Sequence, residues 1–431
     1  MSRREPRQPQ TDWNDPQTML SVDEARARIL AAFSPLPSVQ SPLLDALGLV
    51  LSEDIQSSVN VPPFGNSAMD GFALKSHDTA DATPKTPRTL RVRGEVAAGQ
   101  SPATLVEPGT AIRIMTGAPL PDGADAVIRF EEVVEVGSSS TDPQIELSRP
   151  VRPFENVRAA GEDVRAGSTV VRAGTVLRPL VIGLLAAIGR TTVDVIRRPV
   201  VAILSTGDEI VEPDHEPGPA QIRNSNGPML AALTRQYGGE PRQLGIARDS
   251  EPAIRKLLRT CGEADLLVTS GGVSVGDFDA VKQVLQREGQ IDLWRVRMKP
   301  GKPLAFGFIG GTPLLGLPGN PAAAAVAFRQ FGRPAIRKML GLAQLEPRSV
   351  RAQLEADIEN RGKRRHFVRG VINIQQGVLA VRPVGGSTSG ALTGLAAANC
   401  FIILPEECDR AAAGEQVDVE LFDDTDLASL N

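Results

Sequence analysis

The sequence predicts a multidomain protein of the α/β plus β class, and three observations support this. Between residues 197 and 342, apolar runs alternate with helical segments, which is typical of a three-layer α/β domain with a parallel sheet. Residues 61–150 and 345–425 contain short alternating runs separated by turn residues, which is typical of β-rich domains. The 431 residues are enough for about two to four domains of ordinary size.

The sequence of residues 1–196 predicts helices and one inserted domain. Residues 1–17 are polar and rich in proline, so we expect a disordered tail. Residues 18–60 read as helical, and Ser21 with Glu24 forms the capping-box pattern at the start of "SVDEARARILAAF". Residues 151–196 contain the apolar segment "VLRPLVIGLLAAIGR", which predicts a buried helix. We expect residues 18–60 and 151–196 to form one discontinuous helical and linking domain, with the β-rich residues 61–150 inserted between its two parts.

The α/β domain and the C-terminal domain follow. "PVVAILSTGDEI" and "ADLLVTSGG" predict buried strands, and a long helix is expected from Asn320–Pro321 onward. Residues 345–425 predict a small β-barrel or sandwich.

Composition excludes several functional classes. The net charge of −4 provides no general basic surface for nucleic acid. Cys261, Cys400 and Cys408 form no C-x-x-C pair, so neither a disulfide framework nor a thiolate zinc site is expected. This agrees with a reducing, cytoplasmic location. The most apolar segment is short and carries Arg178, so no membrane span is expected.

Four loops at expected strand ends carry the candidate binding site: "STGDE", "TSGGVSVGDFD", "KPGKP" and "GLPGNP". Ligands of open α/β sheets bind beyond the carboxyl ends of the strands. Glycine-rich loops and a helix N-terminus suit phosphate, and Lys299 and Lys302 add positive charge. Glu209, Asp277 and Asp279 would repel phosphate unless a divalent cation, such as Mg²⁺, lies between them.

Each of these signals has a simpler explanation when taken alone. "SGG" and "KPGKP" individually read better as turns, whereas four such loops in one domain favour a phosphate-ligand site. Walker A and Rossmann glycine patterns are absent from the sequence. His77, His215 and His366 are expected in surface loops, because no two have metal-ligand spacing. Asp70 in "NSAMDG" either caps a turn or reaches a site in another domain or subunit.

Taken together, the motifs resemble the molybdopterin molybdenumtransferase family (MoeA and the E domain of gephyrin). The resemblance runs in order through nearly the whole chain beyond about residue 18, in "PPFGNSAMDGFAL", "IRIMTGAPLPDGADAVI", "GEDV", "STGDE", "NSN", "GIARD", "TSGGVSVGDFD", "MKPGKPLAFG", "GLPGNP", "FVRG" and "NCFIILPE". It implies a molybdopterin-binding α/β domain, a C-terminal β-barrel, and a homodimer with the active cleft between subunits. The implied reaction binds adenylylated molybdopterin, releases AMP with the help of Mg²⁺, and joins molybdate to the dithiolene.

The resemblance also implies roles for individual residues. The implied catalytic residues are Asp70, Thr116, Asp163, Glu209 and Asp279, and the implied metal-linked acids are Asp249 and Asp279. The implied molybdate contacts are Lys299, Lys302, Arg369 and Ser389, with Ser387 as the alternative register for the last. Arg295 stands where a lysine is common in the family. The substrate loops contribute Ser205, Thr206, Gly207, Ser270, Gly271, Gly272, Pro318 and Pro321.

Two other functions compete with this interpretation. The first is a molybdopterin- or nucleotide-binding pyrophosphatase on the same α/β domain, which would account for residues 198–340 alone. The second is a non-catalytic scaffold of the gephyrin kind. The implied partners are a second copy of the chain, a molybdopterin adenylyltransferase and molybdenum apo-enzymes. The choice between molybdate and tungstate stays open.

Overall fold

The computed structural model describes residues 19–137, 142–248, 250–258, 262–272, 289–384 and 392–422. They belong to two compact units. Unit 1 comprises Met1–Val39, Gly48–Val50 and Val195–Asn431, and unit 2 comprises Gln40–Leu47 and Leu51–Asp194. The expected N-terminal tail, residues 1–17, lies outside the described residues. No helix among the described residues is long and apolar enough to cross a membrane.

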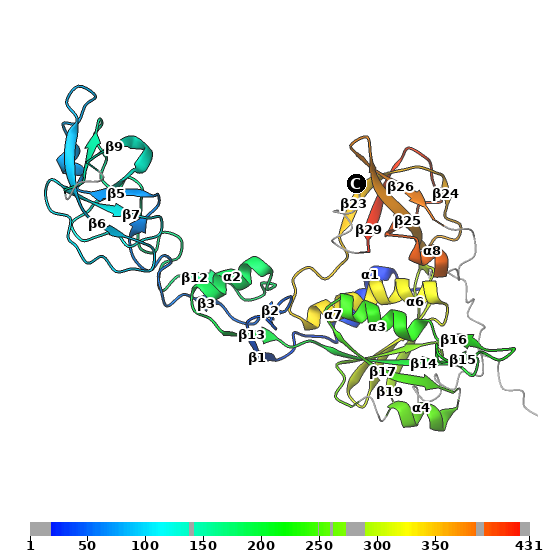
Figure 1. Ribbon diagram of the computed structural model, residues 1–431. Helices are drawn as coiled ribbons and strands as arrows, with labels where there is room; N and C mark the ends of the chain where they lie inside the picture. Colours follow the sequence, from blue (N-terminus) through cyan, green and yellow to red (C-terminus); the bar gives the residue numbers. More distant parts are fainter. Residues whose placement is uncertain are drawn as a thin grey trace, which may run out of the picture. The chain divides into compact units, whose positions relative to one another are not determined.

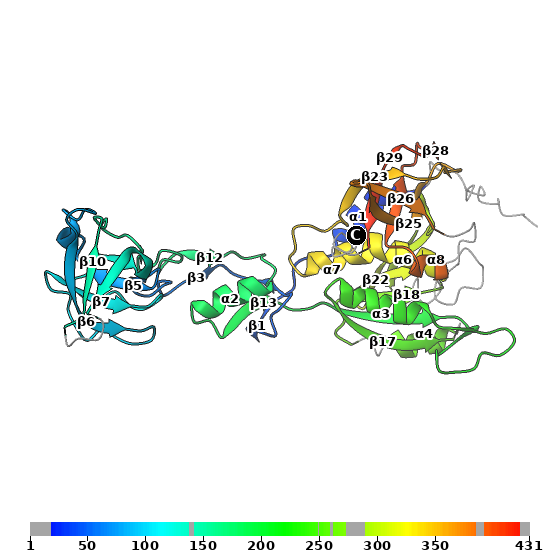
Figure 2. The same cartoon turned by 45° about the horizontal axis from the view of Figure 1, so that its top comes forward.

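The centre of unit 1 is a six-stranded sheet in the order β17 (Glu240–Ala247), β14 (Val200–Thr206), β18 (Leu266–Ser270), β22 (Thr312–Leu317), β21 (Pro303–Ile309) and β19 (Gly289–Arg295). The first four strands are parallel, and β14 is buried along nearly its whole length because helices cover both faces of the sheet. Helices α3 (Asn226–Gln236) and α6 (Pro321–Ala327) lie over one face and α4 (Glu251–Leu258) over the other (Figures 1 and 2).

The predicted α/β domain is confirmed, with one difference in the sheet. Strands β21 and β19 run antiparallel to their neighbours, so the sheet is mixed rather than parallel. The cause is local: the turn at Gly310 and Gly311, both with positive φ, joins β21 directly to β22 as a hairpin. The long helix expected from Asn320–Pro321 is present, as α6, a π-helical turn (Phe328–Gly332) and α7 (Arg333–Met339).

The C-terminal region forms a closed five-stranded barrel. Its strands are β23 (Ser349–Leu354), β25 (Arg365–Gln375), β26 (Val378–Pro383), β27 (Cys400–Leu404) and β29 (Gln416–Leu421). Strand β25 pairs with both β26 and β27 and so closes the sheet on itself. Strand β20 (Met298–Lys299) adds to β25, β24 (Ile358–Glu359) pairs with β28 (Arg410–Ala411), and α8 (Leu392–Ala396) precedes β27. The barrel alternative is therefore confirmed over the sandwich.

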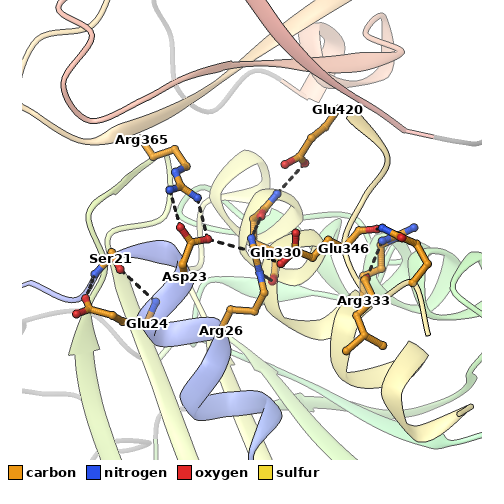
Figure 3. A network of polar contacts seen from close by, with 11 residues as sticks. Ser21, Asp23, Glu24, Arg26, Gln330, Arg333, Glu346, Arg365 and Glu420 are labelled. Atoms are coloured by element: carbon orange, nitrogen blue, oxygen red, sulfur yellow. Dashed lines mark hydrogen bonds and ion pairs between the residues drawn. The ribbon is translucent and has the colours of Figure 1, made fainter. Parts of the chain in front are cut away.

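Helix α1 (Val22–Leu30) belongs to unit 1 and carries the predicted capping box. Ser21 Oγ accepts from Glu24 N at 3.1 Å, and Glu24 Oε2 accepts from Ser21 N at 2.7 Å. Behind it, buried Arg26 donates to the Gln330 side chain at 2.7 Å and pairs with Glu346 at 2.9 Å (Figure 3). Arg365 of the barrel pairs with Asp23 of α1 at 2.8 Å. These polar contacts join the N-terminal helix to the α/β core and to the barrel.

The prediction that residues 18–60 are helical is wrong beyond α1. The chain forms β1 (Ser38–Pro42), β2 (Val50–Leu51) and β3 (Ile55–Gln56), with turns between them. Pro42 lacks a backbone donor and Gly48 has φ of +77°, so a helix cannot continue through them. The apolar residues do not share one buried side either, because Leu44 is 78% exposed.

Unit 2 contains a six-stranded sheet in the order β8 (Ala126–Arg129), β5 (Gly71–Leu74), β7 (Thr110–Ile114), β6 (Arg88–Val96), β10 (Gln144–Leu147) and β9 (Val133–Val136). Buried clusters around Phe72 and around Ile112 cover its two faces. The short elements of unit 2 are 3₁₀ turns at Ser76–Thr79 and Phe130–Glu132, the strands β4 (Asn66–Ser67), β11 (Val157–Arg158) and β12 (Thr169–Val171), and the helix α2 (Pro179–Ala187). Strand β13 (Thr192–Ile196) begins in unit 2 and ends in unit 1.

Helix α2 corrects a further expectation. The sequence predicts a buried helix here, and the helix exists, but only Ile182 and Leu185 within it are buried. Leu180 is 89% exposed in the single chain. The uniformly apolar composition of the segment therefore does not mean burial on all sides within one chain.

Candidate functional site

Three parallel strands bring their glycine-rich loops to one edge of the unit 1 sheet. The neighbouring strands β14, β18 and β22 end at Thr206, Ser270 and Leu317. The chain leaves β14 toward β17 on one side, and after β18 it continues to β22 on the other side. This reversal of direction opens a crevice beyond the strand ends, which is where open α/β sheets bind ligands.

Hydrogen bonds lock these loops to the start of α3. Asn226 Nδ2 donates to Ser270 Oγ at 2.7 Å and to Gly319 O at 2.8 Å. Ser205 Oγ donates to Asn224 Oδ1 at 3.0 Å, and the same oxygen accepts from Gly227 N at 2.9 Å. The two asparagines thereby connect the ends of β14, β18 and β22 in one network.

The loops approach each other as closely as glycine allows. Gly271 has φ of +93°, and a Cβ there would lie 2.7 Å from Thr206 O. Gly271 N donates to Leu317 O at 3.1 Å, so this loop is held against both neighbouring strands. At the end of β14, a Cβ on Gly207 would lie 2.5 Å from Glu209 Oε2, so the exposed Glu209 carboxylate folds back over this glycine. Gly272 continues the β18 loop and is half-buried.

The fourth loop, "KPGKP", lies on the first turns of α6. A Cβ on Gly301 would lie 3.2 Å from Met298 Cε and 3.4 Å from Ala323 O. Helix α6 itself begins with Pro321 at its first turn and Asn320 as cap, whose Oδ1 accepts from Ala322 N at 3.1 Å. Lys299 and Lys302 are half-buried on this loop, and Pro318 is buried just before the helix. The loop therefore belongs to the same edge of the domain as the α6 N-terminus.

Arg295 and Arg369 lie on strands of two different sheets of unit 1. Arg295 is the last residue of β19 and is half-buried. Arg369 lies on β25 of the barrel, and a Cβ on Gly394 of α8 would come within 3.0 Å of its guanidinium. The glycine in α8 thus makes room for the arginine.

His366 departs from its sequence interpretation. It was expected in a surface loop, but it lies on β25, half-buried, in register with Lys299 of β20. Its Nδ1 is buried and has no hydrogen-bond partner in the described part of the chain. Burial, with the positive charges of Lys299 and Arg364, lowers the pKa of His366 to about 4. The imidazole is therefore neutral at physiological pH.

The described residues offer oxygen ligands of the kind that Mg²⁺ prefers. Glu209 supplies a carboxylate at the end of β14. Asn226 Oδ1 is buried and has no hydrogen-bond partner among the described residues. Mg²⁺ commonly takes one or two carboxylates and completes its shell with water and substrate phosphates. The oxygen atoms of Glu209 and Asn226 are thus of the type that fits Mg²⁺. Over the described ranges, no group of three or more His, Cys, Asp or Glu side chains could hold a metal.

Three predicted residues lie in unit 2. Asp70 Oδ1 accepts hydrogen bonds from Thr116 N and Thr116 Oγ1, both at 2.7 Å. These two bonds hold the pKa of Asp70 below its usual range, the backbone bond contributing most. Asp163 is exposed and its backbone N donates to Val61 O at 3.0 Å. The structure thus brings Asp70 and Thr116 into direct contact.

The remaining predicted residues, Asp249, Asp277, Asp279, Ser387 and Ser389, lie outside the described residues. The sequence interpretation also missed site residues. Three asparagines organise the loops: Asn224, Asn226 and Asn320. The sequence motifs that contain them indicate a binding site but not this role. The available signal was the position of each asparagine, within three residues of a helix start, where the side chain can cap the backbone.

Comparisons with known proteins agree with this architecture. Residues 20–189 match the MoeA N-terminal region (domain I and II), residues 202–338 a probable molybdopterin binding domain, and residues 351–422 the MoeA C-terminal region (domain IV). The fold and the crevice thus define a multidomain protein built around a molybdopterin-binding type of α/β domain.

Full-length relatives narrow this class. Molybdopterin molybdenumtransferases of Staphylococcus epidermidis and Haemophilus influenzae are 35% and 37% identical, and the matches cover 94% of this chain and 96% and 99% of theirs. The crystal structure of a molybdopterin biosynthesis MoeA protein from Pyrococcus horikosii is 32% identical with a TM-score of 0.81, covering 94% of this chain and 99% of that one. The chain belongs to the molybdopterin molybdenumtransferase family, and this predicted membership is confirmed.

Proposed function

We propose that this transferase of molybdenum cofactor biosynthesis inserts molybdate into adenylylated molybdopterin and releases AMP in a Mg²⁺-dependent reaction. The observation that carries the proposal is the convergence of the β14, β18 and β22 loops on the N-terminal ends of α3 and α6. Such an edge provides backbone N–H groups and positive potential for a phosphate ligand. Relatives named molybdopterin molybdenumtransferase support the choice of substrate.

The residues of this chain bind and orient the reacting groups. The loops that follow Gly207 and Gly271, with the start of α6, suit the pyrophosphate of the adenylylated substrate. The N–H groups of Gly207 and Gly271 themselves donate to Ala247 O and Leu317 O and so fix the loops in place. Lys299 and Lys302, with Arg369 on the barrel, supply positive charge for a second oxyanion, molybdate. Glu209 would hold Mg²⁺, which would supply Lewis-acid polarisation of the phosphoanhydride.

Unit 2 would contribute a positioned carboxylate. Thr116 holds Asp70 through two hydrogen bonds to one oxygen, which keeps this acid ionised and fixes its orientation. The second oxygen remains for a substrate group or a metal-bound water. Catalysis of this kind is electrostatic positioning and needs no covalent enzyme intermediate.

The assembly belongs to the same proposal. We infer a homodimer in which the active cleft is completed by a second copy of the chain, as the family resemblance implies. The supporting features are a catalytic pair on unit 2, a phosphate-binding edge on unit 1, and exposed apolar residues such as Leu180 on α2. A cytoplasmic location, a molybdopterin adenylyltransferase as upstream partner and molybdenum apo-enzymes as recipients complete the proposal.

The first experiment is to measure AMP release from adenylylated molybdopterin with Mg²⁺, with and without molybdate. Molybdate-stimulated release is the expected result. Release that no oxyanion stimulates would instead indicate a pyrophosphatase on the same fold. Tight substrate binding without release would indicate a scaffold, and either result would overturn the proposal.

A further inference from the structure

Unit 1 contains a mainly apolar cavity of about 310 Å³ between α3, α6, α8 and the barrel. Helix α6 lies beside both α3 and α8 (Figures 1 and 2). The apolar lining includes Leu233 of α3, Leu395 of α8, and the rings of Phe401 and Phe422. None of the residues to which the proposed function gives a role lines this cavity. Its volume is at the lower end of the range for sites that bind small molecules.

A buried hydroxyl without an acceptor lies in the wall of this cavity. Tyr237, at the end of α3, is 5% exposed, and the Arg329 guanidinium lies close enough to its hydroxyl to act on its pKa. Arg329 can only donate, and the hydroxyl has no hydrogen-bond acceptor among the described residues. The ring itself is held firmly, since it stacks on Phe328 at 6.0 Å and lies under the Arg333 guanidinium at 5.8 Å. Burial raises the pKa of the phenol, so it stays protonated and can donate. Buried hydroxyls in folded proteins nearly always find a partner, so this one indicates a missing acceptor.

A positive charge lies in the same wall. Arg329 is 5% exposed and is fixed by the carbonyl oxygens of Leu421 and Phe422, the latter at 3.2 Å. Its Nε lies 3.6 Å from a Glu420 oxygen and makes no hydrogen bond in the described part of the chain. The nearest carboxylate is itself shared, because Glu420 also accepts from Gln330 Nε2 at 2.8 Å. A cation that is only partly compensated favours an anionic ligand group nearby.

We propose that this cavity binds a small molecule with a ring or branched apolar body and one anionic, oxygen-bearing end, which accepts a hydrogen bond from the Tyr237 hydroxyl and lies beside Arg329. The aromatic and aliphatic lining would bury the apolar body, and the two polar groups would select the anionic end. The site is separate from the phosphate-binding edge and does not depend on the proposed reaction.

The test uses the full-length chain and two fluorescent probes of similar shape. Anilinonaphthalene sulfonate carries an anionic group, whereas phenylnaphthylamine is neutral. Both should bind saturably at this cavity. Tyr237→Phe should weaken binding of the sulfonate about tenfold, because it loses a hydrogen bond to a charged group, and should leave the neutral probe unchanged. Leu233→Trp should weaken both probes, since the larger side chain fills the half-buried cavity wall.

Leu44→Trp is the matched control, because it adds the same ring at an exposed apolar position of unit 2. It should bind both probes as the wild type does. Wild-type affinity in Leu233→Trp, or equal effects of Tyr237→Phe on the two probes, would overturn the proposal. Binding that appears only after the chain is shortened to end at Phe422 would also overturn it, because the protein's own C-terminal residues would then be the occupant.

Discussion

At the residue scale, Asn226 connects the β18 loop and the β22 loop to the start of α3. Its amide nitrogen donates to the β18 and β22 loops, and its position opens α3, while its amide oxygen stays without a hydrogen-bond partner in the described structure. A side chain that served stability alone would use both ends. We therefore interpret Asn226 as holding the crevice in shape for a ligand.

Asn226→Ala tests this role. The loss of two hydrogen bonds should lower the free energy of unfolding by about 2 kcal/mol, measured by urea denaturation. The affinity for adenylylated molybdopterin should fall about tenfold, because the loops lose their alignment. Asn399→Ala is the matched control, since Asn399 makes two hydrogen bonds with the Ile372 backbone in the barrel. Equal substrate affinity in the two variants would contradict the role.

His366 makes a prediction about pH. Because its pKa is lowered to about 4, the folded protein keeps it neutral where the unfolded chain takes up a proton, from pH 6.5 downward. The free energy of unfolding is therefore not reduced by His366 above pH 6.5, and it decreases as the pH falls from 6.5 toward 4. Between pH 7 and pH 5, the free energy of unfolding should fall in both proteins. The fall should be about 1 kcal/mol smaller in His366→Gln than in the wild type, after allowance for the partial exposure of His366.

The measurement is urea unfolding at several pH values, with His77→Gln as control. His77 is exposed in a 3₁₀ turn of unit 2. If both variants follow the wild-type pH dependence, His366 is not buried as described. The sequence could not have indicated this behaviour, because the burial of His366 depends on β20, which lies far away in the sequence and pairs with it only in the fold.

At the scale of elements, the strand-to-loop junctions decide the geometry of the site. Gly271 has a positive φ and contacts the backbone of β14, so any side chain must move one of the two strands. Gly310, in the turn between β21 and β22, also has a positive φ but has open space around it. Comparing substitutions at Gly271 and Gly310 therefore separates the effect of the close contact with β14 from the effect of the positive φ angle.

Gly271→Ala should therefore abolish detectable AMP release and destabilise the protein by about 3 kcal/mol or more. Gly310→Ala should cost about 1 kcal/mol, from the φ angle alone, and keep full activity. Thermal unfolding and the AMP-release assay measure both effects. An active Gly271→Ala protein would show that the two loops do not need to touch.

Helix α1 depends on its buried arginine. Arg26 contacts Gln330, Glu346 and Asp23, and its side chain is almost fully buried (Figure 3). Arg26→Ala should lower the free energy of unfolding by about 3 kcal/mol, because its partners lose a buried donor. Arg88→Ala, which removes an exposed pair with Asp81, should cost less than about 1 kcal/mol. Similar losses in the two variants, by chemical denaturation, would contradict this account.

Elements were predictable from the sequence where local signals determine them. Local sequence alone determines the capping box of α1, the strands before "STGDE" and "TSGG", and the helix start at Asn320–Pro321. Residues 31–60 were not predictable in this way, because β2 and β3 are stabilised by strands more than a hundred residues later. The exposure of Leu180 on α2 was not predictable either, since apolar composition does not say which side of a helix is buried.

At the scale of the whole molecule, the proposed dimer makes a quantitative prediction. Asp70→Ala alters unit 2 and Lys299→Ala alters unit 1, and each variant alone should be inactive in the AMP-release assay. If one cleft uses unit 2 of one chain and unit 1 of the other, a mixed dimer contains one intact cleft and one with both changes. Unfolding and refolding an equal mixture should then restore about a quarter of wild-type activity.

The control is a mixture of each variant with itself, treated in the same way. No recovery in the mixed sample, with dimers verified by sedimentation, would place both residues in the cleft of a single chain. The alternative of a pyrophosphatase is less favoured, because the family match extends from residue 20 to residue 422 rather than covering the α/β domain alone. The alternative of a scaffold is less favoured, because relatives that match over most of the chain are named molybdopterin molybdenumtransferase.

Unit 1 is formed from segments that are far apart in the sequence, so the order of synthesis on the ribosome affects when it can fold. Helix α1 emerges first, but Gln330, which receives two hydrogen bonds from Arg26, follows 304 residues later. Unit 2 is complete by Asp194, long before most of unit 1 has been translated. During most of translation, α1 therefore lacks its native contacts, and Val22, Ala25 and Ile29, which are buried in the folded protein, stay exposed. Helix α1 is thus among the last of the described elements to reach its native contacts, and an interruption of translation before Gln330 would leave that helix without its partners.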